Sequence, residues 1–255
     1  MPPSEPSVIL SCEHGGNQLP RWIRMAVKPG RRVLESHRGW DPGALELARK
    51  FSRSLRAPLF AGQITRLAID LNRSLENPDA WSKYSTSLPA ADRRRLVQGV
   101  YTPYRRDVER AIVGIMGASP VLHLSVHSFT PILRGERRTV DIGLLFDPVR
   151  KLESALCHRW LRELRRLRPR LRVQFNRPYR GTDDGFTTYL RTKLPGSRYA
   201  GVELEVNQRL VRASSAAWNA LQEDLIMSLR GALAVTSASR RNMTGDPRSG
   251  KAGHS

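Results

Sequence analysis

The segment 202–208, with the sequence VELEVNQ, restricts the possible folds of this chain more than any other stretch. Apolar residues alternate with two carboxylates, and this period of two is typical of a strand whose side chains point alternately to opposite faces. Glu203 and Glu205 therefore share one face. A carboxylate beside a protein core is costly unless a metal ion, a cation or hydrogen bonds compensate its charge. The segment thus predicts a buried strand that ends in a polar site.

Two other apolar segments end in the same way. Residues 7–12 are followed by Glu13 and His14, and residues 120–126 are followed by His127. Because ligands of α/β sheets bind at the carboxyl ends of the strands, we expect these side chains at one sheet edge. Three strand ends that carry histidine or glutamate predict the layout of an enzyme. Glu13 alternates with His14, so it is expected to point away from the site or to brace it.

Helical and strand-like patterns alternate along the chain. Strands are expected at 7–12, 58–62, 66–71, 121–126, 140–146, 171–175 and 199–206, and helices at 41–55, 89–116, 148–166, 186–194 and 215–234. The long helical stretch is expected to be interrupted near Pro103. Short strands separated by helices favour an α/β fold with a mixed, mostly parallel central sheet flanked by helices. We expect a single domain over residues 1–236 and a disordered basic tail over residues 237–255.

Composition limits the classes of function. The chain has 255 residues, of which 40% are hydrophobic, and this is typical of a globular domain. No apolar run approaches the roughly 20 residues that a membrane span needs, and the N-terminus lacks the features of a secretory signal. Cys12 and Cys157 are the only cysteines, too few for a disulfide framework. These features predict a cytoplasmic protein without a membrane partner.

The formal net charge of +20 arises mainly from arginine. A basic surface attracts phosphate, so a non-catalytic, nucleic-acid-associated α/β protein is one alternative function. No zinc-finger spacing, RNA-recognition signature or basic region with heptads accompanies the arginines, and specific nucleic-acid binding is therefore not expected. The same positive field would attract a small anionic substrate.

The segment 65–73, with the sequence TRLAIDLNR, combines a carboxylate, an amide and two guanidinium groups. Arg73 can hold a carboxylate through two parallel hydrogen bonds, and Arg66 can stabilise a developing oxyanion. Asp70 is expected to hold either arginine in place. A structural salt bridge at a strand end would explain the same residues.

Three histidines lie on or beside the predicted strands. His123 and His127 share one strand face, but His127 lies where the strand becomes a loop. We therefore favour His127 as a ligand and interpret His123 as a core residue. His14 directly follows the first strand, where it can bind a metal or act as a base. A turn or a capped strand end would account for either of these two histidines taken alone.

These segments together resemble the N-formylglutamate amidohydrolase family, which is related to the zinc carboxypeptidases and aspartoacylases. The resemblance covers residues 8 to 210 and is carried by His14, by His127 and Ser128, and by the segments DLNR (70–73), NRPYRG (176–181) and EVNQ (205–208). It implies a zinc-carboxypeptidase-like fold, one zinc ion held by histidine and carboxylate ligands, a water molecule activated by that zinc, and a glutamate as general base. It also implies an amidohydrolase that acts in histidine degradation.

Carried over residue by residue, the resemblance assigns His14 and His127 as zinc ligands and Glu205 as the general base. It also assigns Arg66 as the group that polarises the scissile carbonyl and Arg73 as the binder of the substrate's carboxylate. Apart from these assignments, Asn72 and Arg180 are further candidates for substrate binding. Arg180 and the segment 183–185 (DDG) are expected in a loop that lines the pocket, although turn formation explains the DDG segment equally well. Glu203 shares the face of Glu205 one step earlier on the strand, so it remains an alternative base.

The third zinc ligand is a point where the chain departs from the related carboxypeptidases. Asn17 stands where a His-x-x-Glu motif would place a ligand, and an amide is a poor ligand for zinc. Asp41, at the start of the predicted helix 41–55, is the substitute ligand that we favour. Capping of that helix is its alternative role. The choice between Asp41 and Asn17 stays open at this point.

The sequence therefore predicts zinc-dependent hydrolysis of the amide bond of a small anionic N-acylamino acid. The leading substrate is N-formylglutamate, which would give glutamate and formate. Besides the nucleic-acid-associated protein, a degenerate family member that binds such a compound without hydrolysing it remains an alternative.

Overall fold

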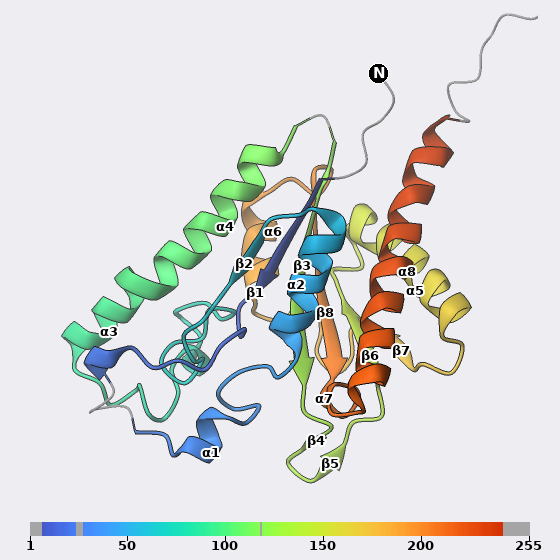
Figure 1. Cartoon of the computed structure of the whole chain (residues 1–255). Coiled ribbons are helices and arrows are strands. Elements are labelled where there is room, and N and C mark those ends of the chain that lie inside the picture. Colours follow the sequence, from blue (N-terminus) through green and yellow to red (C-terminus); the bar gives the residue numbers. More distant parts are fainter. Residues whose placement is uncertain (1–6, 24–27, 118, 242–255) are drawn as a thin grey trace, which may run out of the picture.

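The computed structural model describes residues 7–23, 28–117 and 119–241 (Figure 1). A six-stranded sheet with the order β2-β1-β3-β8-β6-β7 lies at its centre. The strands are β1 (Ser7–Cys12), β2 (Leu59–Ala61), β3 (Val121–Phe129), β6 (Ile142–Leu145), β7 (Val173–Phe175) and β8 (Tyr199–Asn207). A separate hairpin, formed by β4 (Ile132–Leu133) and β5 (Glu136–Arg137), extends beyond the lower end of the sheet in Figure 1.

The first four strands of the sheet order, β2, β1, β3 and β8, are parallel to one another, whereas β6 runs antiparallel to β8 and β7 is parallel to β6. The expected mixed, mostly parallel sheet is therefore confirmed. The central strands β3 and β8 are buried along their whole length. Their register pairs Ser125 with Glu203 and His127 with Glu205, so the polar residues of both strands lie side by side.

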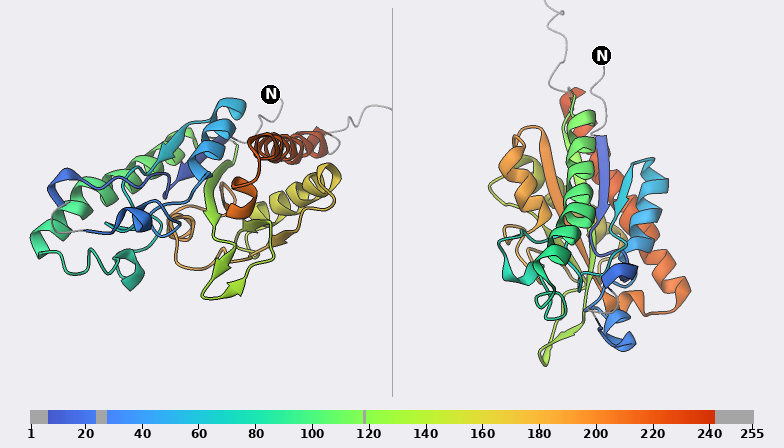
Figure 2. Two further views of the ribbon diagram at one scale, coloured as in Figure 1. Left: turned by 60° about the horizontal axis from the view of Figure 1, so that its bottom comes forward. Right: turned by 90° about the vertical axis from the view of Figure 1, so that its left-hand side faces the viewer.

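Helices cover both faces of this sheet (Figure 2). On one face, the apolar side chains of β1, β3 and β8 form a core with α2 (Ala44–Leu55), α5 (Lys151–Leu167) and α8 (Ser215–Arg241). On the other face, α4 (Thr102–Ile115) and α6 (Phe186–Lys193) pack against a smaller cluster that includes Ile9, Val121 and Tyr199. The polar residues of β3 and β8 share this second face, since side chains alternate along a strand. No helix of the described ranges is long and apolar enough to span a bilayer.

The remaining helical elements are short: α1 (Arg31–Leu34), α3 (Ala90–Leu96), α7 (Gln208–Val211), and 3₁₀ turns at Arg21–Ile23 and Pro78–Ala80. A π-helical turn over Val97–Tyr101 joins α3 to α4. The interruption predicted near Pro103 takes the form of this wide turn. Pro103 itself lies at the start of α4, directly after this wide turn, where its ring cannot donate a helical hydrogen bond to the preceding turn.

The strand predicted at 66–71 is wrong, because this segment forms turns. The N–H of Ala68 donates to the carbonyl of Thr65 (3.0 Å), and the Thr65 hydroxyl accepts from the N–H of Leu67 (3.3 Å). Ile69 and Leu71 are buried in a third apolar cluster, outside the sheet. Burial without a strand thus explains the apolar pattern that suggested one.

The closing helix extends further than predicted. α8 continues to Arg241, so residues 237–241 of the expected tail are helical. The rest of that tail, residues 242–255, lies outside the described residues.

Phe51 of α2 is fully buried, and its ring contacts that of Trp160 edge to face, with 6.4 Å between centroids. We expect Phe51→Ala to lower the free energy of unfolding by about 3–5 kcal/mol, because it removes a large buried ring and leaves a cavity. Urea denaturation measures this change. As a control, Val113→Ala on α4, where the side chain is 53% exposed, should change stability by less than about 0.5 kcal/mol. Equal effects of the two substitutions would contradict the assignment of Phe51 to the core.

Candidate active site

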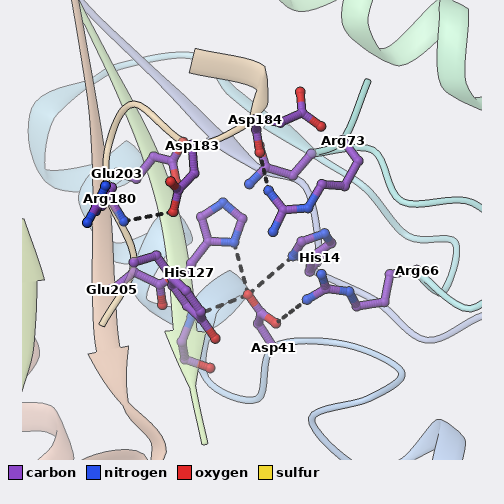
Figure 3. Close-up of a pocket in the computed structure, with 13 residues that line it drawn as sticks. His14, Asp41, Arg66, Arg73, His127, Arg180, Asp183, Asp184, Glu203 and Glu205 are labelled. Carbon is purple, nitrogen blue, oxygen red and sulfur yellow. Dashed lines mark hydrogen bonds and ion pairs between the residues drawn. The ribbon is translucent and has the colours of Figure 1, made fainter. Parts of the chain in front are cut away.

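The carboxyl ends of β1, β3 and β8 meet at one edge of the sheet and open into a pocket of about 100 Å³ (Figure 3). All eight residues predicted for the site line this pocket: His14, Asp41, Arg66, Asn72, Arg73, His127, Arg180 and Glu205. The lining also contains Ser128, Tyr179, Asp183, Asp184 and Glu203. Segments that are far apart in the sequence therefore converge as the strand-end pattern predicts.

His14, Asp41 and His127 form the centre of the pocket. Asp41 Oδ2 lies 2.9 Å from His127 Nδ1 and 3.4 Å from His14 Nδ1 (Figure 3). One ligand atom from each of the three residues lies within 4.8 Å of the other two, and all three side chains are buried. The N–H of Asp41 donates to the carbonyl of His14 (2.9 Å), which ties the segment before α2 to the end of β1.

The Nε2 atom of each histidine contacts a second carboxylate, on the opposite side of the ring from Asp41. His14 Nε2 lies 2.7 Å from Asp70 Oδ1, and His127 Nε2 lies 3.1 Å from Glu13 Oε2. Both Nδ1 atoms consequently face Asp41, and His14 Nδ1 is buried without a hydrogen-bond partner among the described residues. A carboxylate on the far nitrogen is typical of metal-binding histidines, since it fixes the tautomer and the ring orientation.

Of the two expectations for Glu13, the structure supports the second: Glu13 does not point away from the site but contacts and orients His127. Glu13 is fully buried and also accepts hydrogen bonds from Ser125 Oγ (2.6 Å) and Tyr104 OH (3.1 Å). The strict alternation of a strand ends with β1 at Cys12, so Glu13 and His14 can both serve the same site.

The charges of this cluster depend on one another. Burial opposes ionisation of Asp41, but the neighbouring His14 and His127 outweigh it and hold the pKa of Asp41 well below its usual value. Burial likewise opposes protonation of His127, but hydrogen bonds to Asp41 and Glu13 raise its pKa well above the usual value. The cluster is therefore arranged to hold a positive charge between carboxylates.

Glu205 and Glu203 occupy different environments. Glu203 Oε1 accepts a hydrogen bond from Thr187 Oγ1 (2.6 Å), whereas Glu205 Oε2 is buried without a partner among the described residues. Burial raises the pKa of Glu205 to about 8, with Asp41 and Glu203 adding to this shift and the charge of His127 opposing it. A carboxyl group that titrates near neutral pH is suited to transfer protons.

Arg66 is fixed by the same carboxylate that orients His14. Its Nη2 donates to Asp70 Oδ2 (2.6 Å), and its Nη1 lies 3.6 Å from Asp41 Oδ1. The expected contact of Asp70 with an arginine is thus confirmed. The charges of Asp70 and Asp41 outweigh the effect of burial and raise the pKa of Arg66, so this guanidinium remains charged.

Two further arginines reach the pocket from loops. Arg73 and Arg180 lie on either side of His127 in Figure 3. The guanidinium of Arg73 donates to the carbonyl of Asp184, and the backbone N–H of Arg180 donates to Asp183 Oδ2 (3.0 Å). Neither arginine side chain forms an ion pair with a carboxylate among the described residues.

Asn17 and His123 lie outside this pocket. Asn17 donates to the carbonyl of Leu34 (3.2 Å) and lines a separate cavity, so the structure brings Asp41, not Asn17, to the histidines. His123 is fully buried between Ser11 Oγ (2.7 Å) and Tyr199 OH (2.8 Å), as expected for a core residue.

Tyr179 is a pocket residue that the sequence did not single out. The residue is 37% exposed, and its hydroxyl accepts a hydrogen bond from Arg138 Nη1 (2.9 Å). Its position next to Arg180, in the segment NRPYRG, was the only available signal.

Comparison with known proteins agrees with this site. The sequence model of the N-formylglutamate amidohydrolase family matches residues 6–212, a range that includes every pocket residue. The chain belongs to the N-formylglutamate amidohydrolase family. Its membership identifies it as an amidohydrolase and confirms the resemblance seen in the sequence.

Solved structures of similar fold span nearly the whole chain. A gene product of Agrobacterium tumefaciens is 29% identical, with a TM-score of 0.75, over 91% of this chain and 92% of that chain. N-formylglutamate amidohydrolase from Ralstonia eutropha is 22% identical, with a TM-score of 0.69, over 94% of this chain and 97% of that chain. No curated protein matches this amidohydrolase significantly.

The shifted pKa of Glu205 predicts how the stability of this amidohydrolase depends on pH. The folded state holds this proton up to about pH 8, whereas an ordinary glutamate loses it near 4.5. Between these values the folded state binds more protons than the unfolded state, so this group makes the free energy of unfolding fall as pH rises. We expect Glu205→Gln to reduce that fall in chelator-treated protein. Urea denaturation at about pH 5 and pH 8 measures it, and equal pH dependence of the variant and the wild type would contradict the environment described for Glu205.

Proposed function

We propose that this amidohydrolase uses one zinc ion to hydrolyse the amide bond of a small N-acylamino acid. The leading substrate is N-formylglutamate, which would give glutamate and formate. The observation that carries the proposal is the buried group of His14, Asp41 and His127. Beside it lies the carboxyl of Glu205, whose Oε2 has no hydrogen-bond partner among the described residues.

The residues at the centre of the pocket fit a zinc ion. Two imidazole nitrogens and one carboxylate oxygen are donors that catalytic zinc sites use, and such sites keep a further position open. The buried Nδ1 of His14, which lacks a hydrogen-bond partner among the described residues, supports a ligand role. When bound, zinc supplies a Lewis acid that polarises a carbonyl and makes water more acidic.

The protein's own groups supply the remaining chemistry. In its ionised form, which the positive charge of a bound metal would favour, Glu205 accepts a proton from the attacking water and delivers it to the nitrogen that leaves when the amide bond breaks. Arg66, fixed by Asp70, stabilises the negative charge that develops on the carbonyl oxygen. Since Asp70 also orients His14, one carboxylate aligns the metal-binding and oxyanion-binding parts of the site.

Substrate binding is assigned to Arg73, Asn72 and Arg180. Arg73 binds a carboxylate of the substrate, and Arg180, on the other side of His127, is available for a second one. We place the reaction in histidine degradation. We also propose a cytoplasmic location, which agrees with Cys12 and Cys157 being buried free thiols.

Metal content is the direct test of the zinc site. We expect about one zinc ion per chain in elemental analysis of the purified protein, and loss of that zinc in His127→Ala and Asp41→Ala. His158→Ala, at an exposed position of α5, serves as the matched control and should keep the zinc. Absence of metal in the wild type after zinc is offered would refute the site. Full occupancy in Asp41→Ala would refute Asp41 as a ligand.

Activity distinguishes the two candidate bases. With N-formyl-L-glutamate as substrate, we expect Glu205→Gln to lower kcat by about 10²–10⁴-fold while zinc content stays unchanged, since the amide cannot accept the proton. Glu203→Gln should have a much smaller effect, because Glu203 is already engaged with Thr187. A larger loss in Glu203→Gln than in Glu205→Gln would reverse the assignment.

A further inference from the structure

Arg105 of α4 is a buried cation enclosed by aromatic rings. Its side chain is 5% exposed, and it forms no ion pair within the part of the chain that the structure describes. The rings of Tyr101, Phe186 and Tyr189 surround its guanidinium, with centroids 4.9, 4.4 and 4.5 Å away. A cation removed from water is costly, and aromatic faces compensate only part of that cost. A buried arginine of this kind is therefore not expected to contribute much to the free energy of unfolding.

The polar contacts of Arg105 point to the substrate-binding loop. Its Nη1 donates to the carbonyls of Leu71 (3.1 Å) and Arg73 (3.3 Å). Tyr101 OH donates to the same Arg73 carbonyl (2.8 Å). These bonds fix the backbone on both sides of Asn72, within the segment DLNR.

The three rings around Arg105, here called the aromatic cage, also connect this loop to the loop before α6. Phe186 begins α6, and its N–H donates to Asn72 Oδ1 (2.7 Å). The guanidinium of Arg73 donates to the carbonyl of Asp184, two residues before Phe186. Arg105 therefore contacts both loops: it bonds to the backbone beside Asn72, and its guanidinium packs on Phe186, which follows Asp184 by two residues.

The helix that carries Arg105 is distorted in the turn that precedes it. Its buried positions are Leu96, Tyr101, Arg105, Val108 and Ile112, so the first step spans five residues and the later steps three or four. The five-residue step coincides with the π-helical turn Val97–Tyr101. A regular α-helix would place its next buried position one or two residues earlier. The wide turn, a feature frequent at functional sites, thus places both Tyr101 and Arg105 within hydrogen-bond distance of the Arg73 carbonyl.

We propose that Arg105, with Tyr101, is a positioning residue that holds Arg73 in the orientation needed to bind the substrate carboxylate. This inference rests on the carboxylate-binding role of Arg73 in the proposed function. Bidentate binding of a carboxylate demands a fixed guanidinium plane, and a mobile backbone at Arg73 would lose that alignment. Arg105 itself does not touch the substrate.

The test compares Arg105→Lys with Arg106→Lys in the full-length, zinc-loaded protein. Arg106 is the exposed neighbour on the same helix and pairs with Asp107, so its substitution is a matched control. With N-formyl-L-glutamate, we expect Arg105→Lys to raise KM by roughly tenfold, with kcat within about twofold and zinc content unchanged, whereas Arg106→Lys changes none of these quantities. A fall in kcat or zinc content with KM unchanged would overturn the inference.

A milder variant covers the case in which Arg105→Lys fails to fold. Tyr101→Phe removes one hydroxyl and keeps the ring of the cage, so we expect a folded protein whose KM rises by about threefold. An unchanged KM in Tyr101→Phe, together with loss of folding in Arg105→Lys, would assign both residues to stability alone.

A double substitution shows whether Arg105 acts through Arg73. In the background of Arg73→Lys, Arg105→Lys should raise KM by no more than about twofold further, because the group that it positions is already altered. An equal rise in both backgrounds would overturn the inference.

Failure of the proposed function is recognised separately. It would appear as a wild type that binds zinc but does not hydrolyse N-formyl-L-glutamate. In that case the dissociation constant of glutarate, measured by calorimetry, replaces KM. Weakening of roughly tenfold in Arg105→Lys but not in Arg106→Lys would support the positioning role, whereas equal affinities or no binding of glutarate by the wild type would overturn it.

Discussion

A continuous chain of contacts between acids and histidines runs through the carboxyl edge of the sheet: Glu13, His127, Asp41, His14 and Asp70. Each of these side chains is almost completely buried, and the transfer of one charged group from water costs several kcal/mol. The cost is offset only if opposite charges, or a metal ion, lie at the right distances. The ends of β1 and β3 and the segment before α2 must therefore come together in one arrangement, and the rest of the site is built around it.

The strands that carry this site also build the core. Leu122, Leu124 and Val126 of β3 pack against the helices of one face, while the residues between them point to the other face. A shift of β3 by one residue would exchange the two sets, so the core fixes the register that pairs His127 with Glu205. Close packing of the apolar face thus gives the polar face its rigidity.

The sequence predicted the sheet and the strand-end residues well, because a period of two and a terminal histidine or glutamate are local signals. Local signals failed where long-range contacts decide. Asp41 and His127 are 86 positions apart, so the sequence favoured Asp41 over Asn17 only from ligand chemistry and could not show that it meets the histidines. The segment 66–71 is apolar enough for a strand, yet the hydroxyl of Thr65 bonds to the following backbone and makes it a turn.

This turn brings Arg66 and Asp70 closer together than a strand would. In a strand, Arg66 and Asp70 would lie about 13 Å apart, four residues along one face, which is too far for a direct ion pair at 2.6 Å. The turn brings them together, and Asp70 then reaches His14 with its other oxygen. Arg105 of α4 donates to the carbonyls of Leu71 and Arg73 at the end of this irregular segment, and the preceding residue, Tyr104, donates to Glu13 beside His127. Adjacent residues of one helix thus contact both the carboxylate that orients His127 and the loop that carries Arg73, so a helix and not the loops alone fixes the spacing between these two parts of the pocket.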